Sequence, residues 1–287
     1  MILDVEKKEL AGIVLWQGKS LYDGKRIMVV ASGIFEKTSN RKTGNMVQIW
    51  IMRKDINPIK ALKDTEYKSC CGNCKMADNK FGNLCYVNCC HGPLPVFNNY
   101  HDGGYRNYQD GDLELLKDRY IRVGAYGDPA FVPTEVWDVI CNSCKGFTGY
   151  THQWDNPKID QNLKKYFMAS VDSISTYNVE FKKAQKMGWR TFRVREGLNN
   201  PLADNEFVCP ASKEAGILTD CQHCGSCNGL TNRSSKNPVI IYHKATPIFG
   251  YLHKYIALMT AIKNKKQYRK YSTIKKTTRR RAKRVAR

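Results

Sequence analysis

The sequence predicts an α/β fold, built as a relay of parallel β-strands and helices that forms a partial or irregular (β/α) barrel. From residue 112 onward, short apolar and β-branched runs alternate with segments of helical period. The two longest helical segments have 12 and 14 residues, enough for a helix to cross between neighbouring parallel strands. Residues 12–53 hold further strand-like runs, which predict a β-rich segment ahead of the relay.

Each element follows from the local pattern. Pro58 after Asn57 predicts a short helix over 59–64, because proline favours the first helical position. The apolar, β-branched runs predict strands over 12–18, 26–33, 46–53, 120–126, 147–154, 167–172, 189–195, 206–210 and 238–245. The periodic segments predict helices over 113–119, 134–145, 158–166 and 175–188, the last of which ends at Gly188.

These elements divide the chain into four parts. The β-rich segment covers 1–66, a first cysteine-rich loop covers 67–111, and the β/α core covers 112–248 with a second cysteine cluster at 209–229. Residues 249–287 predict a helix that docks on the body and continues into a basic tail.

The second cysteine cluster, CPASKEAGILTDCQHCGSCNG, carries the strongest chemical signal. Its four cysteines are separated by 11, two and two residues, and they are Cys209, Cys221, Cys224 and Cys227. Thiols this close cannot all pair as disulfides without strain, but they can converge on one metal centre. The C-x2-C-x2-C triplet with a remote Cys-Pro favours a 4Fe-4S cluster, and zinc is the alternative.

The first cysteine cluster offers more ligands than one metal needs. Six cysteines lie between residues 70 and 90, followed by His91. We expect Cys71, Cys74 and Cys85 to bind a metal or a cofactor-binding cluster, with Cys89, Cys90 or His91 as a possible fourth ligand. A structural zinc loop is the alternative.

The composition favours a cytoplasmic protein with reduced cysteines. The 287 residues hold 12 cysteines, and the first ten, MILDVEKKEL, contain no apolar run typical of a secretion signal. No stretch of about 18 apolar residues predicts a membrane span. In a long chain without a signal peptide, this cysteine content indicates metal ligation rather than disulfides. We therefore expect thiolate ligands and no membrane partner.

The positive charge is concentrated at the C-terminus. The net charge is +21, and residues 263–287 contribute 13 Lys or Arg and no Asp or Glu, so the remaining chain carries about +8. Such a segment releases counterions when it meets a polyanion, which predicts nucleic acid as its partner. The residues that we expect to contact nucleic acid are Lys275, Lys276, Arg279, Arg280, Arg281, Lys283 and Arg284. A solubilising or packaging tail is the alternative.

Polar residues follow the predicted strands, where parallel folds usually place their chemistry. Asp128, His152, Asp172 and Arg193 are the candidate catalytic residues, and they share one face with the second cysteine cluster if the strands pair in sequence order. Each has a structural alternative, because such residues also cap helices or pair with acids. Cys141 and Cys144 lie in an apolar periodic segment and are interpreted as helix-face thiols.

Several strings resemble a widespread group of bacteriophage proteins of undetermined function. They include RVGAYGDPAFVPTEVW, TGYTHQW, GWRTFRV and CPASKEAG, and the resemblance covers about residues 44–244. It implies a phage origin, with a location in the host cytoplasm or the virion.

More distantly, a cysteine loop ahead of a β/α relay is similar to radical-SAM enzymes with an auxiliary iron–sulfur cluster. This resemblance implies that Cys71, Cys74 and Cys85 hold a reactive cluster that uses S-adenosylmethionine, and that the later four cysteines hold the auxiliary cluster. The chain departs from the usual C-x3-C-x2-C motif, because residue 77 is alanine.

Three functions follow as hypotheses: a metal-containing nucleic-acid-binding protein, an iron–sulfur enzyme, or a virion or scaffold component. The first would act in phage replication, expression or packaging. The sequence contains no G-x4-G-K-[ST] loop and no G-x-S-x-G elbow, which argues against P-loop and α/β-hydrolase chemistry.

Overall fold

The computed structural model describes residues 10–38, 40–77, 85–171, 177–195, 201–231 and 236–241. They belong to a unit that covers Met1–Lys244, and Ala245–Arg287 forms a second unit. The predicted C-terminal helix and basic tail lie outside the described residues.

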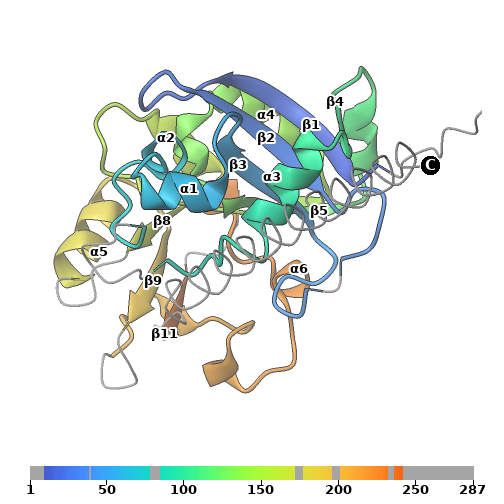
Figure 1. The fold of residues 1–287 in the computed structure, drawn as a ribbon. Helices are drawn as coiled ribbons and strands as arrows, with labels where there is room; N and C mark the ends of the chain where they lie inside the picture. Colours follow the sequence, from blue (N-terminus) through green and yellow to red (C-terminus); the bar gives the residue numbers. More distant parts are fainter. Residues whose placement is uncertain are drawn as a thin grey trace, which may run out of the picture. The chain divides into compact units, whose positions relative to one another are not determined.

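The N-terminal part forms a mixed sheet around three long strands. Strands β1, β2 and β3, which are rich in β-branched residues, pair antiparallel, and β4 joins β1 in parallel. The order across this six-stranded sheet is β4-β1-β2-β3-β5-β6 (Figure 1). Its strands are β1 (Gly12–Lys19), β2 (Arg26–Ser32), β3 (Val47–Arg53), β4 (Tyr105–Asn107), β5 (Tyr120–Tyr126) and β6 (Gly146–Thr148).

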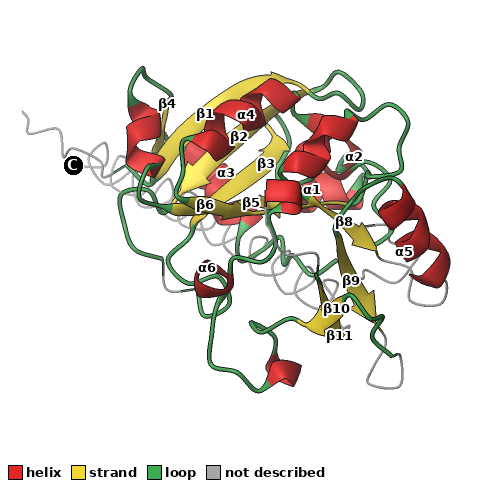
Figure 2. Cartoon of the chain, turned by 180° about the vertical axis from the view of Figure 1, so that it is seen from behind, coloured by secondary structure: helices red, strands yellow, loops and turns green. Residues whose placement is uncertain are grey.

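The second sheet is parallel throughout its described strands. Its order is β10-β11-β9-β8-β7, and Figure 2 shows it continuing from β8 toward β10 and β11. The strands are β7 (Tyr150–Thr151), β8 (Met168–Val171), β9 (Thr191–Arg195), β10 (Glu206–Val208) and β11 (Asn237–Ile241). The predicted parallel relay is therefore present, but β11 enters between β9 and β10, so the strands do not all pair in sequence order.

Helices and short 3-10 turns connect these strands. The α-helices are α1 (Pro58–Lys63), α2 (Lys68–Cys71), α3 (Pro93–His101), α4 (Thr134–Asn142), α5 (Tyr177–Lys186) and α6 (Cys221–Cys224). The 3-10 helices are η2 (Asp112–Leu116), η3 (Pro129–Phe131), η4 (Gln161–Lys165), η5 (Lys213–Ala215) and η6 (Gly229–Thr231). Strands outnumber α-helices among the described residues, and no closed barrel is seen there, so a partial barrel stays a prediction.

Gly149 joins the two sheets. It is the single residue between β6, which pairs with β5, and β7, which pairs with β8. Its carbonyl oxygen accepts the Met168 N–H at 3.1 Å, so the pairing to β8 continues across the junction. A Cβ atom at residue 149 would lie 2.5 Å from Cδ1 of Phe167, which only glycine avoids.

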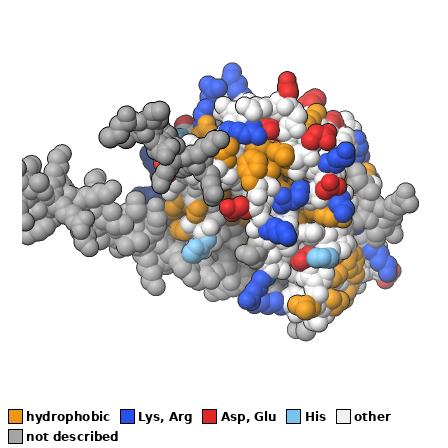
Figure 3. Space-filling view, turned by 90° about the vertical axis from the view of Figure 1, so that its right-hand side faces the viewer, with side chains coloured by type: hydrophobic (Ala, Val, Ile, Leu, Met, Phe, Trp, Pro, Cys, Tyr) orange, Lys and Arg blue, Asp and Glu red, His pale blue; other side chains and the backbone are white. Residues whose placement is uncertain are grey.

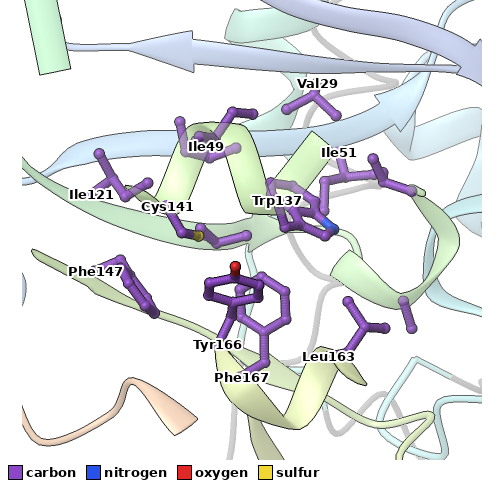
Figure 4. Close-up of a cluster of buried hydrophobic side chains, with 14 of the residues drawn as sticks. Val29, Ile49, Ile51, Ile121, Trp137, Cys141, Phe147, Leu163, Tyr166 and Phe167 are labelled. Atoms are coloured by element: carbon purple, nitrogen blue, oxygen red, sulfur yellow. The ribbon is translucent and has the colours of Figure 1, made fainter. Parts of the chain in front are cut away.

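One hydrophobic cluster spans both sheets. Helix α4 inserts Trp137 and Cys141 between the strands, and Figure 4 shows both side chains facing Ile49 and Phe167. The Trp137 and Phe167 rings meet edge to face at 5.5 Å, and the Trp137 Nε1–H donates to the Pro129 carbonyl at 2.9 Å. Cys141 is therefore a core thiol on a helix face, as predicted.

Some of the predicted helical segments contain an α-helix, whereas two others form only short 3-10 helices. Segment 175–188 contains α5, followed by Gly188 at φ +80°, the left-handed conformation that ends many helices. Segments 113–119 and 158–166 form only η2 and η4. Asp160 accepts the Asn162 N–H at 2.9 Å as the N-cap of η4, so this helix begins at Gln161 rather than at Lys158.

Within the described residues, no helix combines the length and apolar character needed to cross a membrane.

Replacing Gly149 by alanine is expected to reduce the free energy of unfolding by about 1–3 kcal/mol, because the new methyl group overlaps the Phe167 ring. Urea denaturation of both proteins in the same metal state measures the change. Lys158→Ala, at an exposed residue, is the control and should change stability by less than about 0.5 kcal/mol. Unchanged stability of Gly149→Ala would mean that Phe167 moves aside without cost.

Candidate metal centres and the adjoining pocket

The second cysteine group, Cys209, Cys221, Cys224 and Cys227, is assembled from two segments. Cys209 follows β10, and its N–H donates to the Val239 carbonyl of β11 at 2.8 Å. Cys221 and Cys224 begin and end α6, a single turn that Asp220 caps by accepting the His223 N–H at 2.9 Å. The Cys221 N–H donates to the Lys42 carbonyl at 2.8 Å, which holds α6 beside the loop before β3 (Figure 1).

The four sulfur atoms of this group lie within electrostatic range of one another. Burial raises the pKa of Cys227, and thiolate charge on the other three cysteines raises it further. Burial also raises the pKa of Cys209 to about 11, again with contributions from Cys221 and Cys224. The Tyr150 hydroxyl makes a hydrogen bond with the Cys227 sulfur. Burial therefore favours the neutral thiol form of Cys209 and Cys227 when no metal is bound.

Two cations adjoin this group. Burial raises the pKa of Cys221, whereas the positive charges of Arg122 and Lys42 oppose that increase. Neighbouring cations stabilise thiolates, and a cluster of four thiolates with a metal carries net negative charge. The surroundings of the second cysteine group therefore suit an anionic metal centre.

The first cysteine group consists of Cys70, Cys71, Cys74, Cys85, Cys89 and Cys90. Burial raises the pKa of Cys71 far above its usual range, and thiolate charges on Cys70, Cys74 and Cys85 add to this effect. Cys85 also contributes to the raised pKa of Cys89, which burial brings to about 12. The structure thus brings the predicted ligands Cys71, Cys74 and Cys85 within electrostatic range, with Cys89 beside Cys85.

Backbone contacts fix this group against the end of β5. The Asp128 N–H donates to the Cys70 carbonyl at 2.7 Å, and the Gln153 Nε2 amide donates to the Cys71 carbonyl at 3.3 Å. Tyr126 is buried beside the group, and its pKa is raised first by burial and then by charge on Cys71 and other cysteines.

The donor chemistry of both groups fits a metal, although neither forms a closed ligand shell. Thiolates are the ligands that zinc and iron–sulfur clusters prefer. All 12 cysteines are free thiols in the described residues, where no group of three or more His, Cys, Asp or Glu side chains has the geometry to hold a metal ion.

The two cysteine groups lie at different ends of β5 rather than on one shared face. The first group adjoins Tyr126, the last residue of β5, whereas the second adjoins Arg122, near its start. Four residues of extended strand span at most about 13 Å. The expectation that the four candidate catalytic residues share one face with the second cysteine group assumed that all strands pair in sequence order, which the position of β11 contradicts, so that shared face stays a prediction.

Asp128 and His152 come together as the strand-end argument predicts. The Asp128 carboxylate accepts the His152 N–H at 2.7 Å and the Ala130 N–H at 3.0 Å, and it lies 3.9 Å from the His152 Nδ1 atom. Burial raises the pKa of Asp128, while the nearby His152 opposes this increase. The hydrogen bond comes from the backbone of His152, and 3.9 Å is too long for one to the ring, so the contact fixes the position of the residue but not the orientation of its imidazole. Asp128 also caps η3, as its structural alternative predicts. We refer to this pair as the Asp128–His152 dyad.

The other two candidate catalytic residues do not extend this dyad. Asp172 lies outside the described residues. Arg193 binds Glu206 through two hydrogen bonds, from Nε at 2.7 Å and from Nη2 at 2.6 Å. Both side chains are almost completely buried and reach across β11, from β9 to β10. Arg193 therefore follows its structural alternative, pairing with an acid inside the sheet.

A pocket opens between the first cysteine group and the second sheet. It has a volume of ≈ 350 Å³ and is lined by Asn73 and Lys75 from the cysteine loop, by residues 152–157 after β7, by Ser170 of β8 and by Glu180 of α5. His152 is one of its lining residues, so the dyad adjoins this space.

Sequence reasoning missed the residues that complete these sites. Tyr126 and Tyr150 carry no motif, and only the fold places their hydroxyl groups beside cysteines. The loop carbonyl of Lys42 also gives no local signal. Asn73 and Lys75 directly flank Cys74. This position inside the cysteine loop was the one sequence feature that could have indicated that they belong to the site.

Arg193→Leu and Glu206→Leu are each expected to destabilise the fold by about 3–5 kcal/mol, because each leaves a buried charge without its partner. The double variant should lose less than the sum of the single changes, and urea denaturation of all three measures the difference. The exposed Lys117 and Glu114 pair, 3.8 Å apart, is a control whose removal should change stability by about 0–1 kcal/mol. Native stability of Arg193→Leu would contradict the structural role.

The known proteins give no guide to function, because no family model, curated protein or solved structure matches this chain. The phage and radical-SAM resemblances therefore stay predictions. The functional assignment depends on the two cysteine groups, the dyad and the charge distribution described above.

Proposed function

We propose that this chain is a phage-encoded metalloprotein that binds an iron–sulfur cluster or zinc through cysteines and associates with nucleic acid through its basic C-terminal segment. The observation that carries the metal assignment is the gathering of Cys209, Cys221, Cys224 and Cys227 around the buried Cys227. These four thiols come from separate segments and are held by backbone hydrogen bonds from β11 and from the loop before β3. Such an assembly matches the needs of a metal centre better than those of isolated core thiols.

The distribution of charge supports the nucleic-acid partner. On the face drawn in Figure 3, Lys and Arg side chains are interspersed with Asp and Glu side chains. In contrast, residues 263–287 hold 13 cationic residues and no acidic one. A dense cationic segment on a mixed surface favours backbone-directed, sequence-independent binding in phage replication, expression or packaging.

The second candidate function is a radical-SAM-like iron–sulfur enzyme. The observation that favours it is the pocket, which is lined both by residues of the first cysteine loop and by His152. In this case Cys71, Cys74 and Cys85 would hold the cluster, which would supply electrons when bound, and the Asp128–His152 dyad would hold or move a proton. Iron with acid-labile sulfide favours this candidate, whereas zinc alone contradicts it.

Protein purified without oxygen is expected to contain iron with sulfide, or zinc, in stoichiometric amounts. Cys224→Ser should lower the metal content and the melting temperature, because metal binding stabilises the folded state. Elemental analysis, the visible spectrum and thermal unfolding measure these effects. Cys144→Ser, at a partly buried thiol outside both groups, should keep the full metal content. A metal-free protein after metal-replete anaerobic expression, with every thiol titratable, would contradict the proposal.

Replacing Lys275, Lys276, Arg279, Arg280, Arg281, Lys283 and Arg284 by glutamine is expected to weaken duplex DNA binding strongly at low salt. Each lost phosphate contact reduces the slope of log K against log salt by about 0.9, so seven contacts reduce it by about 6 at most. Fluorescence anisotropy over a salt series measures both quantities. Glutamine at the exposed Lys117 and Lys158 is the control and should have little effect. An unchanged slope would exclude the segment as the binding site.

A further inference from the structure

The pocket beside His152 has a lining rich in side-chain amides. Asn73, Gln153 and Asn156 contribute three amide groups to its wall. An amide presents an N–H donor and a carbonyl acceptor side by side, which is the pattern that reads the edge of a nucleobase. Part of this capacity is already used, because Asn73 Oδ1 accepts the Tyr22 hydroxyl at 3.2 Å and Gln153 Nε2 donates to the Cys71 carbonyl at 3.3 Å. The amide NH2 groups of Asn73 and Asn156 and the side-chain oxygen of Gln153 are what the wall offers, which favours a ring with acceptors and a donor at its edge.

Both carboxylates of this pocket are paired with lysines, Glu180 with Lys75 of the lining and Asp155 with Lys183 outside it. Lys75 Nζ lies 2.8 Å from Glu180 Oε1, and Lys183 Nζ lies 3.0 Å from Asp155 Oδ2. Because these pairs balance each other, the wall is polar without a strong excess of one charge. A neutral polar ring is therefore a better occupant than a phosphate group, which would meet two carboxylates.

The pocket also has the size and the apolar elements that a planar ring needs. Its volume of ≈ 350 Å³ is near the lower end of small-ligand sites, which start at about 300 Å³. Trp154 and Pro157 supply the apolar part of the wall. The Trp154 indole is fixed because its Nε1–H donates to the Ser170 carbonyl at 3.0 Å. Enzymes that hold an extruded base combine such an apolar wall with hydrogen bonds to the base edge.

We propose that this pocket binds a nucleobase, presented either by a free nucleoside or by an unpaired nucleotide of a strand. The second source rests on the proposed nucleic-acid association, whereas the first does not. His152, whose backbone N–H is held by the Asp128 carboxylate, then lies beside the bound base. Asn73 directly precedes Cys74, so the base would also lie close to the first cysteine group.

Saturation-transfer NMR on the full chain tests this proposal with adenosine, guanosine, cytidine and uridine as probes at millimolar concentration. At least one nucleoside should receive saturation more strongly at its base protons than at its ribose protons. Since nucleosides carry no phosphate, the basic C-terminal segment gives them no affinity. No transfer to any of the four probes would overturn the proposal.

Asn156→Asp is the sharpest variant, because it keeps the oxygen that accepts the Lys158 N–H at 3.0 Å and removes both amide donors. It should weaken nucleoside binding about tenfold, which corresponds to about 1.4 kcal/mol. Asn98→Asp makes the same change at an exposed residue of α3 and should leave binding unchanged. Asn73→Asp is a second pocket variant should Asn156→Asp unfold. Native affinity in both pocket variants would overturn the proposal.

Single-stranded oligonucleotides distinguish the two sources of the base. If a strand supplies it, an oligonucleotide with one central base among abasic sites should bind more tightly than a fully abasic one, and Asn156→Asp should abolish the difference. Equal binding of both strands, together with nucleoside binding, assigns the pocket to free nucleosides. Strand binding without any nucleoside signal or base dependence overturns the pocket proposal and leaves the proposed function of the tail intact.

Discussion

The close approach of the Gly149 backbone to Phe167 is the constraint on which the described fold depends. This residue lets one extended segment pair with β5 through β6 and with β8 through β7, so that two sheets share one hydrophobic cluster. The same residue donates its N–H to the Cys227 carbonyl at 3.0 Å, which places the second cysteine group against the junction. The backbone of Gly149 thus contributes both to the packing of the core and to the position of a candidate metal centre.

The strands could be predicted from the sequence to a large extent, because β-branched runs bounded by Gly and Asn mark them locally. Their neighbours could not all be predicted. Strand β11 lies between β9 and β10, where the Arg193–Glu206 pair spans it, and the members of this pair lie 13 residues apart and belong to no motif. The helix expected over 158–166 shows a related limit, because the N-cap at Asp160 sets a later start than the apolar period predicts.

The candidate sites could be predicted in part. Spacing alone identified the two cysteine groups, and the rule for strand ends identified Asp128 and His152, which are in contact. The same rule also selected Arg193 as a catalytic candidate, because the sequence does not show which polar side chain pairs with a buried acid inside the fold. It also could not show that the two cysteine groups lie near opposite ends of β5, because that depends on which loops reach which strand.

The insertion of β11 has a consequence for the order in which the chain can be completed during synthesis. Residues 237–241 leave the ribosome after both of their neighbours in the sheet, β9 and β10. Until they arrive, a nascent chain exposes the unpaired edges of two strands, together with a guanidinium and a carboxylate that still carry their hydration shells. The last strand therefore completes the second sheet, and in the same step it removes water from the Arg193–Glu206 pair.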